Sequence, residues 1–300
     1  MYFFYLLKNL GAKMDLIEKT RKAVVRAGTT FSEDRLRACK RALESEEGND
    51  NAIWALEQMI ANSNVAAREG FPLCDDTGIP HVLLEIGSGC ELSSNFFKDI
   101  ELGIAEGLSE LPGRPMAVKD NDIEQRNGLH EESSMVKPVS FLIESDDGST
   151  YSNAVGDDEI NVHVMLQGGG PEIRAKTYRV YHKRSRDLVF GEAISWLEDS
   201  LQMLGCTPSI PAIGIGRSHF EASSLMLRAM VHGSLDNQSD IEEYVSSELN
   251  KTNIGPLGLG GKTTVLGSFV NIGPQRASGV RIVSVRPSCF VEPRVASFKI

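Results

Sequence analysis

Five cysteines are the residues of this sequence best suited to metal chemistry, and they fall into two groups. Cys74, Cys206 and Cys289 each follow a proline or a glycine by one or two positions, which predicts a loop or turn. A thiolate on a loop can reach a ligand, whereas a thiol on a buried helix face cannot. Cys39, inside a predicted helix, and Cys90, after a predicted strand, are interpreted as small apolar packing residues.

The spacing of the three loop cysteines limits the kind of metal centre that they can form. Structural zinc sites and electron-transfer ferredoxins usually contain closely spaced cysteines, and this sequence has no C-x2-C pair. Three isolated cysteines can bind three irons of a [4Fe–4S] cluster and leave the fourth iron open as a Lewis acid. Scattered cysteines are also common, so the spacing alone leaves a packing role or a zinc site with His81 as alternatives.

Glycine-rich loops are a second feature that can bring backbone amides close to an anion or a cluster. The GLGGKTT segment lacks the Walker pattern, because Pro256 stands five positions before Gly261, where that pattern requires glycine. The dinucleotide fingerprint that would begin at Gly214 has His219 in place of its third glycine. Tight turns are the plainer explanation for any one of these glycines.

The helices and strands predicted around these loops indicate an α/β fold, in which a helical N-terminal region precedes a mixed-sheet unit with flanking helices. Apolar side chains at helical spacing predict helices in the first 70 residues and at 96–111, 194–204, 218–230 and 241–249. Short apolar runs predict strands at 82–86, 136–143, 161–166, 211–215, 265–270 and 280–285. The cysteine and glycine loops then stand at the ends of strands and helices.

The chain has no internal repeat and no low-complexity linker, so we expect residues 14–300 to form a single domain. Residues 1–13 are expected to be a ragged N-terminal segment, because Met14 also suits the start of a chain. The apolar run at residues 2–7 is too short to span a membrane and lacks the features of a signal peptide.

Composition and charge narrow the class of protein. A hydrophobic content of 41% in 300 residues is typical of a globular protein. The formal net charge of −10 argues against nucleic acid and anionic membranes as partners. An odd number of cysteines argues against a disulfide framework, and we expect a cytoplasmic protein with free thiols.

Five segments resemble motifs of the class I fumarate hydratases and L-tartrate dehydratases, and they occur in that family's order from residue 71 to about 290. The segments PLCDDTG, QGGGPEIRAKT and GCTPSIPAIGIG are similar to the family's first cysteine signature, a glycine loop and the second cysteine segment. NIGPLGLGGKTT closely matches a further glycine loop, and IVSVRPSCF is similar to the strand that ends in the third cysteine. The chain is identified by this resemblance as a divergent α subunit of an iron–sulfur-dependent hydro-lyase.

The resemblance implies a role for the matching residues of the cysteine segments. Cys74, Cys206 and Cys289 become the ligands of a [4Fe–4S] cluster, and Asp76 becomes a candidate acid/base group beside it. The plainer role of Asp76 is that of a turn residue before Gly78.

The resemblance also implies a substrate pocket and a partner. Arg126 resembles the arginine that receives a substrate carboxylate, a task that suits a guanidinium. The other expected pocket residues are Asp75, Gly169, Gly170 and Glu172. A separate β part completes the active site in this family, and little sequence follows the last motif, so we expect a β subunit as partner in a hetero-oligomer.

Two departures from the family pattern leave the substrate open. Asp75 stands where the family has glutamine, and an ionised aspartate repels a substrate carboxylate. A family histidine about a dozen residues before the third cysteine is replaced in the region of Ala277. We therefore expect reversible dehydration of a small 2-hydroxy acid, fumarate/malate-like or tartrate-like. The competing hypothesis is a non-catalytic iron–sulfur-binding or assembly subunit.

Overall fold

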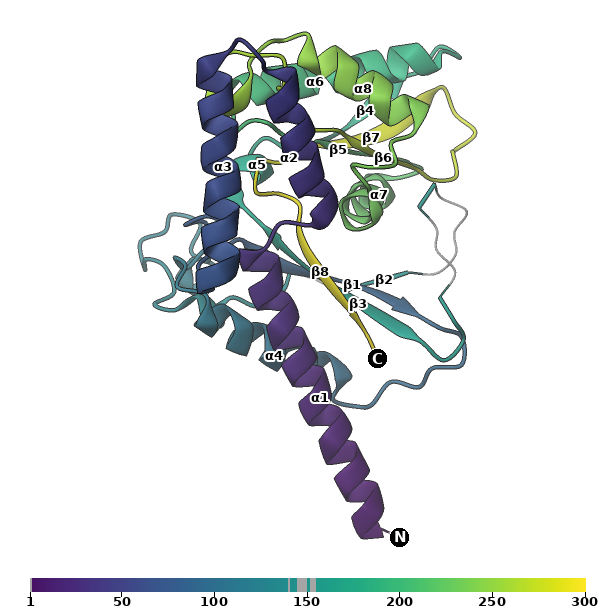
Figure 1. Cartoon of the computed structure of the whole chain (residues 1–300). Helices are drawn as coiled ribbons and strands as arrows, with labels where there is room; N and C mark the ends of the chain where they lie inside the picture. The colour runs from purple at the N-terminus through teal and green to yellow at the C-terminus, as the bar shows by residue number, and fades with distance from the viewer. Residues whose placement is uncertain (1, 140, 145–149, 152–154) are drawn as a thin grey trace.

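Two four-stranded mixed sheets form the frame of the described part of the chain (Figure 1). The computed structural model describes residues 2–139, 141–144, 150–151 and 155–300, with side chains for all of these except 2–13 and 144. The first sheet has the order β2-β1-β3-β8, and the second has the order β4-β7-β5-β6. The strands of the first sheet are β1 (Ile79–Ile86), β2 (Phe141–Glu144), β3 (Ile160–Gln167) and β8 (Arg294–Lys299). Those of the second are β4 (Lys176–Tyr181), β5 (Ala212–Gly216), β6 (Phe269–Ile272) and β7 (Val280–Arg286).

Strand direction is mixed in both sheets. In the first, β1 runs parallel to β2 and antiparallel to β3, and β3 runs antiparallel to β8. In the second, β5 runs parallel to β6, while β7 is antiparallel to both β4 and β5. Since β8 follows β7 in the sequence, the connection between them carries the chain from the second sheet to the first.

Helices cover both sheets. The first sheet packs against α1 (Tyr2–Thr29) and α4 (Phe96–Glu110), and the second packs against α6 (Arg186–Gln202), α7 (His219–His232) and α8 (Asp240–Asn250). The helices α2 (Glu33–Ser45) and α3 (Asp50–Glu69) contact each other along one edge of the molecule (Figure 1). Shorter helical turns are α5 (Gly169–Glu172) and the 3-10 segments Lys119–Asn121, Ser133–Met135 and Pro256–Gly258.

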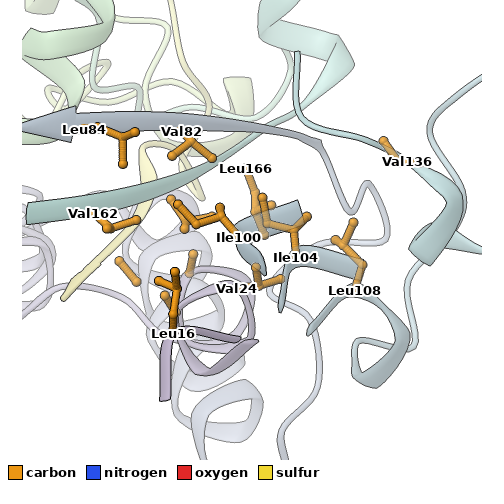
Figure 2. Packing of buried hydrophobic residues seen from close by; sticks show 14 of the residues in the cluster. Leu16, Val24, Val82, Leu84, Ile100, Ile104, Leu108, Val136, Val162 and Leu166 are labelled. Atoms are coloured by element: carbon orange, nitrogen blue, oxygen red, sulfur yellow. The ribbon is translucent and has the colours of Figure 1, made fainter. Parts of the chain in front are cut away.

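The core of the first sheet is made by one apolar face of each packing partner. Figure 2 shows side chains of α1 and α4 pointing at alternate residues of β1 and β3. Its labelled members include Leu16, Val24, Ile100, Ile104, Leu108, Val82, Leu84, Val162 and Leu166, all buried. Burial of this apolar surface is the main contribution to the stability of the first sheet and its helices. The polar residues at the ends of the strands lie outside this core.

The predicted fold class, a helical N-terminal region followed by mixed sheets with flanking helices, is confirmed. Two strands were missed: β4 is mostly exposed, and β8 is rich in polar residues, so neither has a clear apolar pattern. The strand predicted at 136–143 begins only at Phe141, after Pro138, which has no N–H to donate; residue 140 lies outside the described residues.

The strand predicted at 265–270 also begins later, at Phe269. Side chains take the backbone N–H groups that a strand would use: Val265 donates to Asn250 Oδ1 at 2.8 Å, and Ser268 to Gln238 Oε1 at 2.9 Å. At the other end of the chain, α1 continues through Met14 without a break. Among the described helices, none has the length and apolar character needed to cross a membrane.

Candidate active site

Three connecting segments bring the predicted cluster cysteines together where the chain passes from one sheet to the other. Cys74 precedes β1, Cys206 lies between α6 and β5, and Cys289 lies between β7 and β8. Cys74 and Cys289 pack on one apolar cluster, and the backbone N–H of Phe290 donates to the carbonyl of Cys206 at 2.9 Å. The thiol of Cys206 interacts electrostatically with both other thiols. Residues far apart in the sequence therefore face one another.

The surroundings of Cys206 and Cys289 favour the neutral form of both thiols. Partial burial of its sulfur and the neighbouring Cys74 thiol raise the pKa of Cys206, partly offset by Arg174. Burial and the Glu292 carboxylate raise the pKa of Cys289 to about 12. A cationic metal centre would stabilise the thiolates that the protein alone disfavours, and its binding would release their protons.

Among the described residues, the three cysteines do not form a compact group of ligands around a single ion. Thiolates around one tetrahedral zinc ion, with bonds near 2.3 Å, would be about 3.8 Å apart. Within the described residues, the set of three ligating side chains whose atoms lie within 4.8 Å of one another is Glu85, His163 and His232, and it includes no cysteine. Thiols that do not share one ion can each bind a different iron of a cluster.

Asp76 links the first cysteine loop to the glycine loop. Its Oδ1 accepts the N–H of Gly78 at 2.9 Å, which is the turn geometry predicted for it, and its Oδ2 accepts the N–H of Gly169 at 2.8 Å. The backbone carbonyl of Asp76 accepts from Arg294 Nη1 at 2.6 Å. The carboxylate is therefore held in one orientation beside Cys74 and the glycine loop.

A buried ion pair holds the backbone of the glycine loop in place. Arg286 and Glu292 are fully buried and lie 3.2 Å apart, nitrogen to oxygen. Arg286 Nη2 donates to the carbonyl of Gly168 at 3.1 Å, and Glu292 accepts the N–H of Gly168. A Cβ at Gly168 would lie only 3.1 Å from Asp76 Oδ2 and 3.2 Å from Glu292 Oε1, so a larger residue here would have to displace these carboxylates by a few tenths of an ångström. Sequence reasoning missed this pair: Arg286 ends β7 and Glu292 lies in the connection that follows it, and no local pattern marks either residue as buried.

The expected pocket residues of the glycine loop, Gly169, Gly170 and Glu172, all lie in the short helix α5. A Cβ at Gly170 would meet nothing within 4 Å, so this backbone is open to a ligand. Glu172 forms an ion pair with Arg286, and its side chain is largely exposed. A cavity of about 250 Å³ lies beside Glu172 and is also lined by His81 and Lys176.

The arginine beside the first cysteine loop is Arg114, and the structure does not bring Arg126 there. Arg114 Nε lies 3.0 Å from Asp75 Oδ2, and both side chains are exposed. Arg126 is 76% exposed and forms an ion pair with Glu124, its near neighbour in the sequence. Sequence reasoning missed Arg114 because nothing in its local sequence separates it from other surface arginines.

Three other residues discussed from the sequence, Ala277, Cys39 and Cys90, lie outside the candidate site. Ala277 is exposed in the segment before β7, at the opposite end of that strand from Cys289, so its substitution leaves the described cysteine site unchanged. Cys39 is buried on α2, as predicted. Cys90 Sγ lies 3.5 Å from the carbonyl oxygens of Asp157 and Glu159.

Three thiols from separate segments, an oriented carboxylate and an open glycine loop define a candidate active site in a mixed α/β protein. The sequence model of the family described as Fumarate hydratase (Fumerase) matches residues 17–299, and the chain belongs to this family. The predicted family and the predicted enzyme class, a hydro-lyase, are thereby confirmed.

Individual relatives are similar at low identity. A predicted L(+)-tartrate dehydratase subunit alpha of Methanocaldococcus jannaschii is 27% identical over 245 residues, which are 78% of this chain and 81% of the relative. The L(+)-tartrate dehydratase subunit alpha of Escherichia coli K12 is 24% identical over 241 residues, 79% of this chain and 75% of the relative. A predicted class I fumarate hydratase of Geobacillus stearothermophilus is 25% identical over 294 residues, 93% of this chain and 54% of the relative. The chain thus spans about half the length of this last relative.

Removing the buried arginine should destabilise the protein strongly. We expect Arg286→Met to lower the free energy of unfolding by about 3–5 kcal/mol, because Glu292 would remain buried without its counter-charge. Arg126→Met is the matched control, with an expected change within about 0.5 kcal/mol for an exposed pair. Urea denaturation of both variants measures the difference, and equal effects would contradict the supporting role of Arg286.

Proposed function

We propose that this chain is the cluster-binding α subunit of a hydro-lyase that reversibly removes water from a small 2-hydroxy carboxylic acid of the malate or tartrate kind. The observation that carries the proposal is the meeting of Cys74, Cys206 and Cys289 beside Asp76. Membership of the fumarate hydratase family and the names of the tartrate dehydratase relatives support the same reaction class.

The three cysteines would hold a [4Fe–4S] cluster. Their number, their separate segments and the absence of a single-ion arrangement among the described cysteines fit this group. When bound, the cluster supplies an open iron that polarises the hydroxyl and carboxylate of the acid. Free thiols of this kind require a reducing compartment, so we place the protein in the cytoplasm.

Asp76 is proposed to exchange the proton on the carbon next to the hydroxyl-bearing carbon. Two backbone N–H groups fix its carboxylate, which leaves little freedom for a misdirected proton transfer. The open backbone at Gly170 would accept a substrate carboxylate through its N–H. Arg114 would receive a carboxylate as well, once Asp75 no longer occupies its guanidinium.

A β subunit would cover the exposed side of this site. Cys206, Asp75 and Arg114 are all exposed, although a dehydration site needs to exclude water. Two relatives carry the name subunit alpha. The exposed site and these names support a partner chain and a hetero-oligomer.

A non-catalytic iron–sulfur-binding or assembly subunit is the second candidate function. The observation that favours it is the ion pair between Asp75 and Arg114, which neutralises the arginine closest to the first cysteine loop. The two candidates differ in whether loss of the Asp76 carboxylate abolishes a reaction while the cluster remains.

The cluster ligands are tested by single cysteine substitutions. After anaerobic reconstitution, we expect Cys74→Ser, Cys206→Ser and Cys289→Ser each to lose most of the bound iron and sulfide. Cys90→Ser is the matched control and should retain both, because Cys90 lies after β1 beside Asp157. Iron and sulfide analysis decides the point, and a full cluster in any of the three variants would refute that residue's role.

The acid/base role is tested by Asp76→Asn in the complex with the β subunit. We expect the rate of dehydration to fall by roughly 10²–10⁴-fold at unchanged iron content, because the amide cannot exchange the proton. Asp122→Asn is a matched control, since Asp122 also accepts two backbone N–H groups in an exposed turn. A variant at Asp76 that keeps its full rate would exclude this role, and no activity in any form would favour the non-catalytic alternative.

The pairing of Asp75 with Arg114 gives a prediction about affinity. We expect Asp75→Gln to lower the KM for a hydroxy dicarboxylate about tenfold with little change in kcat, because Arg114 becomes available and a repulsive charge is removed. Glu124→Gln, which frees the exposed Arg126, should leave KM unchanged. Steady-state kinetics of the two variants measure both KM values. Equal KM values for Asp75→Gln and Glu124→Gln would argue against Arg114 as a carboxylate ligand.

A further inference from the structure

Glu85, His163 and His232 converge at the other end of the first sheet from the cysteines. Glu85 is near the end of β1 and His163 near the start of β3, whereas the cysteine and glycine loops adjoin the opposite ends of these strands. His232 is the last residue of α7, which packs on the second sheet. One ligand atom from each residue lies within 4.8 Å of the others.

This group is buried and carries an ionised carboxylate. Glu85 is 4% exposed and His163 is 7% exposed. Burial alone would raise the pKa of Glu85, but hydrogen bonds from His163, His232 and Asn161 hold that pKa well below its usual range. The ion-pair partners described for Glu85 are the two histidines, and neither a lysine nor an arginine is among them. A buried carboxylate is costly unless a charge pairs with it, and a bound cation would remove that cost.

The outer contacts of the group resemble those around metal ligands. His163 Nδ1 lies 2.7 Å from Ser297 Oγ. Without a metal ion, His163 Nε2 donates its N–H to Glu85; with a cation between them, the N–H would move to Nδ1 and the Nε2 lone pair would bind the cation. Asn161 Nδ2 donates to Glu85 Oε2 at 2.7 Å and fixes the carboxylate. Ligating histidines usually donate their second ring N–H in this way, and ligating carboxylates are held by hydrogen bonds.

We propose that Glu85, His163 and His232 bind one Zn²⁺ ion that fastens α7 to the first sheet. Ligands of a tetrahedral zinc ion with bonds of 2.0–2.1 Å are about 3.3 Å apart. Here Glu85 Oε2 lies 3.2 Å from His163 Nε2, and Glu85 Oε1 lies 3.1 Å from His232 Nε2. Two imidazoles and one carboxylate form a ligand set that zinc accepts. The site would join the two sheet units independently of the cysteines.

Zinc titration of the full chain tests the proposal, in a Cys74→Ser, Cys206→Ser, Cys289→Ser background that removes competing thiols. Calorimetry should show one Zn²⁺ per chain, and His232→Gln should weaken binding at least about 100-fold. His219→Gln is the matched control, because His219 is exposed at the other end of α7. Its affinity should equal that of the background chain.

Thermal unfolding and cobalt substitution complete the test. Saturating Zn²⁺ should raise the Tm by roughly 5 °C, and this shift should be lost in His232→Gln. Co²⁺ in place of Zn²⁺ should give visible d–d bands that Glu85→Gln and His232→Gln remove, with circular dichroism checking that both variants fold. If a variant fails to fold, Ser297→Ala should instead weaken zinc about tenfold through the outer contact. No zinc binding in the background chain, or equal affinity in all variants, would overturn the proposal and leave a metal-free hydrogen-bonded group.

Discussion

The buried ion pair of Arg286 and Glu292 is the constraint on which the candidate active site depends. These two residues hold both backbone groups of Gly168, so the connection that carries Cys289 is fixed to the loop that orients Asp76. Burying two charges is costly, and the cost is offset only when the geometry satisfies their hydrogen-bonding groups, as the added contacts to Gly168 and Glu172 do. Loss of either partner would release the glycine loop and the third cysteine together.

The first sheet separates two polar sites with an apolar core between them. Its cysteine end carries a site that is open on one side, where the ion pair of Asp75 and Arg114 is exposed. Its other end carries the group of Glu85, His163 and His232, whose side chains are at most 9% exposed. The middle of β1 and β3 packs on α1 and α4 (Figure 2), and this packing keeps both ends in register.

Local signals in the sequence predicted the helices, most strands and the loop positions of the cysteines, because periodicity and turn residues act over a few positions. Contacts over long sequence distances were not predictable in this way. The partner of Arg286 on the glycine loop lies 118 positions away, and His232 meets Glu85 only after the two sheet units have packed. Arg126 was predicted and Arg114 was missed for the same reason: the sequence resemblance indicates one arginine, while only the fold shows that Arg114 lies beside the first cysteine loop.

The central claim is that three cysteines from separate segments hold one cluster with an iron open to the substrate. Mössbauer spectroscopy of the ⁵⁷Fe-reconstituted chain with its β subunit tests this most directly, recorded anaerobically with and without a hydroxy dicarboxylic acid. The account predicts a [4Fe–4S] spectrum in which one iron site changes when the acid is added and the other three do not. A spectrum of isolated iron ions, or a cluster in which no iron responds to any acid, would contradict it.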